Sequence, residues 1–260
     1  MENNFWALIL GGSSGLGLAT AKKLAQHGYH IVILHRDRRT DLDNIEKSFT
    51  EIRAFGNQLL ALNVDALNSD KRTSIISEIK SALPKGHRIK VLVHSIAKGT
   101  LKPMYSEGQP ALTDTDFRIT FDAMALSLYD WTKALVDAAL FALDTRIISF
   151  TSEGNTKALP NYSAVSVAKV ALEALTRSIA LEFAPMGIKA NCIQAGITKT
   201  KSLAMIPGYE NILEHALERN PNKRLTTPED VANAVYLLTT EEAKWITGTV
   251  IKVDGGESLI

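Results

Sequence analysis

The sequence predicts an α/β fold, a single doubly wound parallel sheet of seven strands with helices on both faces. Short apolar runs alternate with longer amphipathic stretches, and several of these segments end at Gly or Pro. The apolar runs are rich in Ile, Val and Leu with little polar alternation, which is typical of strands covered on both faces. Strands that alternate with helices form parallel sheets with right-handed crossovers.

The strands and helices follow one another in a regular order. The predicted strands span 5–10, 30–35, 59–64, 90–95, 146–152, 188–194 and 249–253. The predicted helices span 15–27, 41–55, 69–83, 113–143, 162–184 and 228–239. Thr227 and Pro228 supply the N-cap and the first residue of the last helix. Because no internal repeat or linker interrupts this order, residues 1–260 are expected to form one domain.

Residues 197–226 break the alternation between a strand and a helix. They carry Pro207, Gly208 and Pro221. In open α/β sheets ligands bind outside the carboxyl ends of the strands, where mobile segments close over them. We therefore expect a substrate lid at 197–226.

Composition and charge exclude several classes of protein. The formal net charge is +1, which indicates neither a nucleic-acid partner nor an acidic membrane surface. No run approaches the roughly 18 apolar residues of a membrane span, and the N-terminus lacks the pattern of a signal peptide. Cys192 is the only cysteine and lies in a predicted strand, so we expect a buried thiol and no disulfide within the chain. No cluster has metal-ligand spacing, and we expect a cytoplasmic protein without a metal.

A glycine-rich loop follows the first predicted strand and opens the first helix. Residues 10–17 read Leu-Gly-Gly-Ser-Ser-Gly-Leu-Gly, with the spacing G-x-x-x-G-x-G. Glycines let the backbone approach a pyrophosphate, and the helix N-terminus offers N–H groups and a positive dipole end. This context predicts dinucleotide binding on a Rossmann-type sheet. The loop residues expected at the cofactor are Gly11, Ser13, Ser14, Gly15, Leu16 and Gly17.

This glycine spacing resembles that of the short-chain dehydrogenase/reductase family, and the resemblance covers essentially the whole chain. Leu10 is a departure, because the family usually has Thr at this position. The family places the adenosine ribose at the end of the second strand, where an acidic residue would favour NAD. Here Arg36 stands where NADP-using relatives have a basic residue, and Arg38 is nearby, which favours NADP(H). Asp37 can pair with either arginine, and a solvated charged turn is the alternative.

The usual family signature Tyr-x-x-x-Lys is absent from this chain. Tyr162 and Lys169 are seven residues apart, and on a helix positions i+4 and i+7 both return near the same face. This Tyr-x6-Lys form resembles a divergent branch of the family, the enoyl-[acyl-carrier-protein] reductases. The run 94–97 after the fourth strand and the Pro-Asn pair before Tyr162 match the same branch. With a standard glycine fingerprint, the chain resembles the members that use NADPH.

The resemblance implies NADPH-dependent reduction of the C=C bond of trans-2-enoyl thioesters in fatty-acid synthesis, with hydride added at the β-carbon. Tyr162 would stabilise the resulting enolate and Lys169 would hold the nicotinamide ribose. Ser152 either shares the oxyanion with Tyr162 or simply ends its strand. Asn63 either meets the adenine or is an ordinary strand-end residue. The other residues that the resemblance places at the cofactor are Val64, Ser95, Ile96, Ala97, Gly196, Thr198 and Thr200.

The implied partners are an acyl thioester carried on acyl carrier protein and other copies of the chain in a homotetramer. Two other functions stay open. The first is a short-chain reductase acting on another enoyl or a keto substrate, although the missing Tyr-x-x-x-Lys argues against a carbonyl reductase. The second is a non-catalytic NADP-sensing protein, which the presence of Tyr162 and Lys169 argues against.

Overall fold

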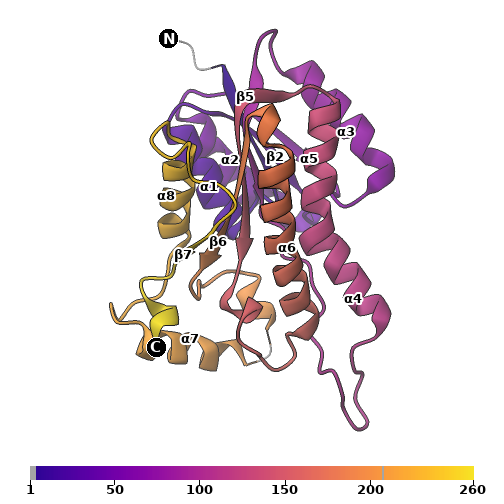
Figure 1. The fold of residues 1–260 in the computed structure, drawn as a ribbon, viewed down its shortest axis with the longest axis vertical. Coiled ribbons are helices and arrows are strands. Elements are labelled where there is room, and N and C mark those ends of the chain that lie inside the picture. The colour runs from indigo at the N-terminus through magenta and orange to yellow at the C-terminus, as the bar shows by residue number, and fades with distance from the viewer. Residues whose placement is uncertain (1–3, 207) are drawn as a thin grey trace.

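The computed structural model describes residues 4–206 and 208–260, and these residues contain seven parallel strands in the order β3-β2-β1-β4-β5-β6-β7 (Figure 1). The strands are β1 Phe5–Leu10, β2 His30–His35, β3 Leu59–Asn63, β4 Arg88–His94, β5 Phe141–Thr151, β6 Ile188–Ala195 and β7 Val250–Val253. The order reverses between β1 and β4, which is the topological switch point of a doubly wound sheet. The predicted fold class is confirmed.

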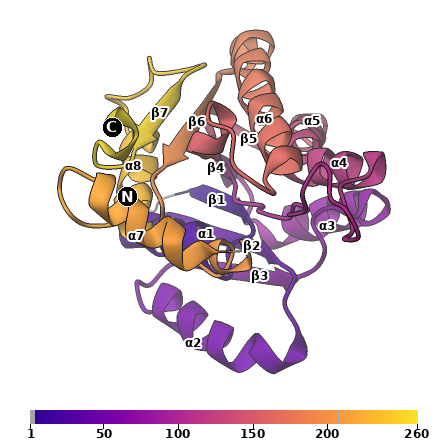
Figure 2. The ribbon, with the colours of Figure 1, turned by 90° about the horizontal axis from the view of Figure 1, so that it is seen from below.

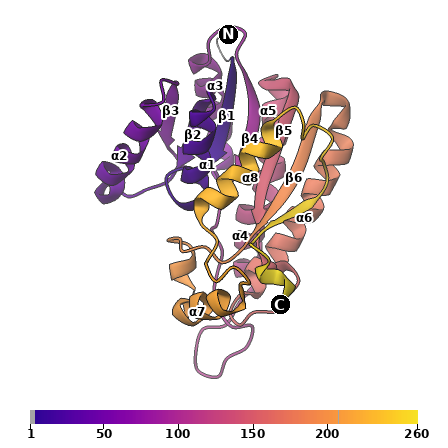
Figure 3. The same ribbon diagram turned by 90° about the vertical axis from the view of Figure 1, so that its left-hand side faces the viewer.

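Helices cover both faces of the sheet (Figures 2 and 3). One face is covered by α1 Gly15–Gln26, α2 Leu42–Arg53 and α8 Pro228–Thr239. The other is covered by α3 Ser69–Ala82, α5 Ser127–Asp137 and α6 Ser163–Glu182, with α4 Asp114–Phe121 beside α6. The helix α7 Tyr209–Arg219 lies at the carboxyl ends of the strands (Figure 1).

The first strand shows why these apolar runs form central strands. Trp6, Leu8 and Leu10 pack into one core cluster, whereas Ala7 and Ile9 pack into the cluster on the opposite face. All five side chains are buried. Because successive side chains point to opposite faces, an apolar run without alternation is stable only between two layers of helices. Each fully buried Leu or Ile contributes about 1.5–3 kcal/mol.

The predicted helix over 113–143 is wrong at its C-terminal end, from residue 138 onward. The chain forms α4, a π-helical segment at Asp122–Leu126 and then α5, which ends at Asp137. Ala139 has φ 52°, and the N–H of Leu140 donates to the carbonyl of Leu135. This is a left-handed helix end of the kind that glycine usually marks. Because alanine takes the place of glycine here, nothing in the sequence marks the helix end, and the apolar run that continues into β5 is predicted as helix.

The other boundaries lie within two residues of their predicted positions, except for the start of β5. The strand β4 begins two residues earlier than predicted, at Arg88, and β5 begins at Phe141 rather than at residue 146. The N-cap of α8 is Thr227, whose hydroxyl accepts from the N–H of Asp230 in a complete capping box. No helix in the described parts of the chain is long and apolar enough to cross a bilayer.

The predicted lid region is more ordered than its sequence suggests. Residues Tyr209–Arg219 within it form α7, and a short 3₁₀ turn lies at Leu203–Met205. Pro207 lies outside the described residues. That this segment moves over a substrate stays a prediction, as does the single domain over 1–260.

Candidate active site

The glycine loop makes two close approaches that leave no room for a side chain. A Cβ on Gly11 would lie 2.4 Å from the carbonyl oxygen of Ser95, and one on Gly17 would lie 2.2 Å from that of Gly11. Gly11 also has φ +85°, a conformation that favours glycine. The loop therefore packs directly against the end of β4 and leads into the N-terminus of α1. Ser14 is the N-cap of this helix and makes no side-chain capping bond. The cradle fits a pyrophosphate bound by backbone N–H groups.

Replacing Gly11 by Ala should weaken NADPH binding at least tenfold, equivalent to about 1.4 kcal/mol, because the loop must move away from β4. Gly86 offers a matched control, since its φ is +89° but a Cβ at this position would have nothing within 4 Å. Gly86→Ala should lose about 1–2 kcal/mol of stability from backbone strain alone and bind NADPH normally. The measurements are a fluorescence titration with NADPH and denaturant unfolding of both variants. Equal effects on binding would contradict the close-approach argument.

The segment after β6 lies beside the glycine loop. The Thr200 methyl carbon would be 3.4 Å from a Cβ on Gly15. The hydroxyl of Thr198 donates to the carbonyl of Gly196 at 2.9 Å, and that of Thr200 accepts from the N–H of Leu203 at 3.2 Å. The structure thus brings together the glycine loop and the 196–200 segment, as the sequence predicts.

The residues after β2 are placed by specific partners. Arg36 Nη1 lies 3.0 Å from Oδ2 of Asp65, and its side chain is 61% exposed. Oδ2 of Asp37 lies 2.8 Å from Nδ1 of His35, so Asp37 turns toward the sheet rather than toward an arginine. The guanidinium of Arg36 is thereby left at the surface next to the end of β2, and Arg38 is also exposed.

The side-chain amide of Asn63 forms two hydrogen bonds with the main chain of the loop after β2. Its Oδ1 accepts from the N–H of Asp37 at 3.1 Å, and its Nδ2 donates to the carbonyl of Asp37 at 3.2 Å. Val64 donates its N–H to the carbonyl of His35 at 2.8 Å. Asn63 therefore braces the loop after β2, and its contact with adenine stays a prediction.

Tyr162 and Ser152 form a pair of hydroxyl groups at the end of β5. Their oxygens lie 3.3 Å apart. Tyr162 is the N-cap residue of α6, and the structure places its ring against Gly154, where a Cβ would lie 2.6 Å from Cε1. Burial raises the pKa of Tyr162, although the Ser152 hydroxyl opposes the shift. Tyr162 is therefore protonated at neutral pH and able to donate a hydrogen bond.

Lys169 is buried on the next turns of α6, on the side facing β5. Its Nζ donates to the carbonyl of Phe150 at 2.6 Å. Burial lowers the pKa of Lys169 to about 8. The ammonium group has three donors, so two are left for a ligand. Val165, which stands where the usual signature would have Tyr, is a core residue with 4% exposure.

Two other polar residues near this site are structural. His94 is buried, its Nε2 lies 2.7 Å from Oγ of Ser127, and burial lowers the pKa of His94 to about 3, so it is neutral. Burial raises the pKa of Cys192 to about 11, as expected for an unreactive core thiol. Among the described residues, no group of three or more His, Cys, Asp or Glu side chains is placed to hold a metal.

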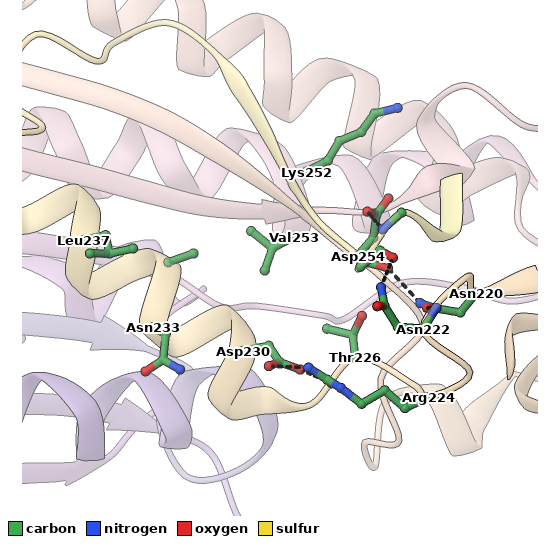
Figure 4. Close-up of a pocket in the computed structure, with 13 residues that line it drawn as sticks. Asn220, Asn222, Arg224, Thr226, Asp230, Asn233, Leu237, Lys252, Val253 and Asp254 are labelled. Atoms are coloured by element: carbon green, nitrogen blue, oxygen red, sulfur yellow. Dashed lines mark hydrogen bonds and ion pairs between the residues drawn. The ribbon is translucent and has the colours of Figure 1, made fainter. Parts of the chain in front are cut away.

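Sequence reasoning missed the turn Glu153–Asn155 that seats the Tyr162 ring. The Ser166 hydroxyl donates to the carbonyl of Gly154, and the Asn155 amide donates to Glu173. The only signal was a glycine two residues after Ser152. A surface hollow beside β7 was also not foreseen, and none of the predicted site residues lines it (Figure 4). Arg224 and Asp230 form an ion pair on its wall, with Nη1 to Oδ2 at 2.5 Å.

A glycine cradle at the switch point of a doubly wound sheet is typical of enzymes that bind a dinucleotide cofactor, and the same chain carries a buried lysine and a hydroxyl pair at the end of β5. The family model described as enoyl-(acyl carrier protein) reductase matches residues 11–258. The chain therefore belongs to the short-chain dehydrogenase/reductase family and resembles its enoyl-(acyl carrier protein) reductases.

Individual relatives are similar over nearly their whole length. The 1-cyclohexenylcarbonyl-CoA reductase of Streptomyces collinus is 27% identical over 256 residues, covering 98% of this chain and 87% of the relative. The enoyl-[acyl-carrier-protein] reductase (NADH) of Aquifex aeolicus is 25% identical with a TM-score of 0.83, covering 100% and 98% of the two chains. YwfH, an NADPH-dependent reductase involved in bacilysin biosynthesis, is 26% identical with a TM-score of 0.82, covering 98% of each chain.

Proposed function

We propose that this protein reduces the C=C bond of a trans-2-enoyl thioester with NADPH. The observation that carries the proposal is the hydroxyl pair of Tyr162 and Ser152, 3.3 Å apart, with Lys169 seven residues after the tyrosine. When hydride adds at the β-carbon of an enoyl thioester, negative charge develops on the thioester oxygen. Two adjacent hydroxyl donors suit that oxyanion.

Tyr162 acts as a hydrogen-bond donor in the proposed reaction. Its raised pKa keeps the phenol protonated, so it donates a hydrogen bond to the enolate oxygen and can pass its proton to the product. Ser152 supplies the second donor to the same oxygen. Gly154 holds the tyrosine ring in place, because no side chain separates the turn from the ring.

Lys169 contributes positive charge from within the site. With a pKa of about 8 it is charged at neutral pH, and its carbonyl partner at Phe150 fixes its direction. Its two remaining donors suit the hydroxyls of a nicotinamide ribose. Bound in the glycine cradle, NADPH supplies the hydride.

The preference for NADPH rests on Arg36. Its guanidinium is exposed at the end of β2, and a forked cation there suits a 2′-phosphate. Arg36→Ala should weaken NADPH binding by roughly 10–100-fold, equivalent to the 1.5–3 kcal/mol of a hydrogen bond to a charged group, and leave NADH binding nearly unchanged. Arg53→Ala, which removes an exposed arginine paired with Glu46 on α2, is the control. A variant that loses affinity equally for both cofactors would show that Arg36 does not read the phosphate.

A second candidate is a reductase of another thioester or of a keto group. The Streptomyces collinus relative is named for a coenzyme A thioester, which favours the coenzyme A version of the same chemistry. Acyl carrier protein as the carrier, the homotetramer, the cytoplasmic location and the place in fatty-acid synthesis stay predictions. A non-catalytic NADP sensor would bind NADPH without turnover.

The direct experiment follows NADPH absorbance with a crotonyl thioester and, separately, with an acetoacetyl thioester. Each is offered on coenzyme A and on acyl carrier protein. Oxidation of NADPH with the crotonyl substrate supports the proposal, and the better carrier identifies the partner. Turnover of the acetoacetyl substrate alone would replace the proposal with a keto reductase. Binding without turnover on either substrate would indicate the sensor.

A further inference from the structure

A charged cluster at the carboxyl end of the sheet joins three distant parts of the chain. Nη2 of Arg219, the last residue of α7, lies 2.6 Å from Oε2 of Glu153 and 2.9 Å from Oε1 of Glu257. The side chains of Arg219 and Glu257 are 12% and 3% exposed. Nζ of Lys157 lies 2.7 Å from Oε1 of Glu153, so two cations balance two carboxylates. In Figure 1 the C-terminal turn and α7 lie together at this end.

One carboxylate belongs to the turn that seats the proposed oxyanion donors. Glu153 follows Ser152 directly, and the next residue, Gly154, is the one that packs against the ring of Tyr162. The Ser166 hydroxyl donates to the carbonyl of Gly154 and fixes the turn to α6. A shift of Glu153 therefore moves both hydroxyl groups of the proposed site.

The other carboxylate holds the segment after β6. Oε2 of Glu257 accepts from the N–H of Ile197 at 3.0 Å. A Cβ on the preceding Gly196 would lie 2.9 Å from the same oxygen. Glu257 thus fixes the start of the segment that carries Thr198 and Thr200 beside the glycine loop.

We propose that Arg219 is a positioning residue that ties α7 at once to the turn beneath Tyr162 and to the 196–200 segment. The inference rests on the proposed function for the roles of these two segments. Arg219 acts through Glu153 and Glu257 rather than on the substrate. Removing one partner of a buried ion pair leaves an uncompensated charge. Loss of the Arg219 guanidinium leaves Glu257 without its cation and Glu153 with Lys157 alone, so α7 is no longer tied to either segment. The position of α7 therefore determines the positions of both the oxyanion donors and the 196–200 segment.

The test compares Arg219→Gln, Arg219→Lys and the control Arg224→Gln. Arg224 lies in the loop between α7 and α8 and is also paired with a carboxylate, that of Asp230 (Figure 4). Arg219→Gln should lower kcat with the crotonyl thioester by roughly 10–100-fold, because a misplacement of about 1 Å can cost that much, and should raise the Kd for NADPH. Arg219→Lys should recover most of both losses, and Arg224→Gln should keep wild-type kinetics.

Hydrogen exchange of the free protein gives a readout that needs no substrate. Arg219→Gln should speed exchange at once in 209–219, 153–157 and 196–200, whereas Arg224→Gln should not. If the wild type reduces no enoyl thioester, the proposed function is wrong. Hydrogen exchange still tests whether Arg219 couples α7 to the 153–157 and 196–200 segments. Where Arg219→Gln does not fold, Glu257→Gln serves, since its amide oxygen still accepts from Ile197. It should speed exchange in 209–219. Unchanged exchange in these segments, or unchanged kcat per folded enzyme, would overturn the proposal.

Discussion

Tyr162→Phe should lower kcat for a crotonyl thioester by about 10²–10³-fold, which is the cost of removing one preorganised oxyanion donor. The phenylalanine keeps the ring that packs on Gly154, and only the hydroxyl 3.3 Å from Ser152 is lost. The Kd for NADPH should stay near the wild-type value, because the glycine cradle and Lys169 are unaffected. Steady-state kinetics and a fluorescence titration measure the two quantities.

Tyr236→Phe is the matched control for this variant. Tyr236 lies on α8 and stacks on His27 with ring centroids 3.5 Å apart, on the other face of the sheet. Its hydroxyl should be dispensable for turnover. Ser152→Ala should cost less than Tyr162→Phe if the two hydroxyls share the oxyanion. Equal kcat in Tyr162→Phe and the wild type would remove Tyr162 from the chemistry.

Deprotonation of Lys169 should cause the loss of activity at high pH. In the proposed mechanism the charged form of Lys169 is the active one, and burial lowers the pKa of its amine to about 8. The value of kcat/KM for NADPH should therefore be constant below pH 7 and fall as the pH rises through about 8, since this ratio reports the free enzyme. A profile that is flat up to pH 9.5 would contradict this role.

Replacing Lys169 by Met should separate function from stability. Loss of the charge should lower kcat/KM at least about 100-fold. The folded-state pKa lies below the ordinary value of 10.5, so folding opposes protonation of this amine, and the penalty is fully present below pH 8. Lys169→Met should therefore raise the free energy of unfolding at pH 7 by up to about 3 kcal/mol, and the gain should shrink as the pH approaches 10.5. Denaturant unfolding at pH 7 and pH 10 measures it.

The order of elements could be predicted because the central strands are short segments rich in Ile, Val and Leu that alternate with amphipathic helices. The bounds of β1 and β2 match their predicted residues. Prediction failed where the local signal was missing. The end of α5 is formed by Ala139 in a left-handed conformation, and no glycine or proline marks it. The helix α7 was not predicted because Pro207 and Gly208 dominate the pattern of its region.

The site residues at the strand ends could be predicted because the sheet topology brings these ends together. Gly11 meets Ser95, and Gly15 meets Thr200, although these pairs are far apart in the sequence. The partners of charged side chains could not be predicted in this way. Asp37 turns to His35, and Arg219 joins Glu153 to Glu257, because such contacts depend on side-chain packing that no periodicity records.

The proposed reaction adds hydride to the β-carbon of an enoyl thioester. The most direct measurement incubates the enzyme with a crotonyl thioester and NADPH deuterated at both C4 positions of the nicotinamide, and locates deuterium in the product by NMR. The wild type should form a butyryl thioester with one deuterium at C3, and the rate of its formation should be about 10²–10³-fold lower in Tyr162→Phe. If the enzyme instead leaves the crotonyl thioester unlabelled and reduces an acetoacetyl thioester, reduction of the C=C bond is ruled out.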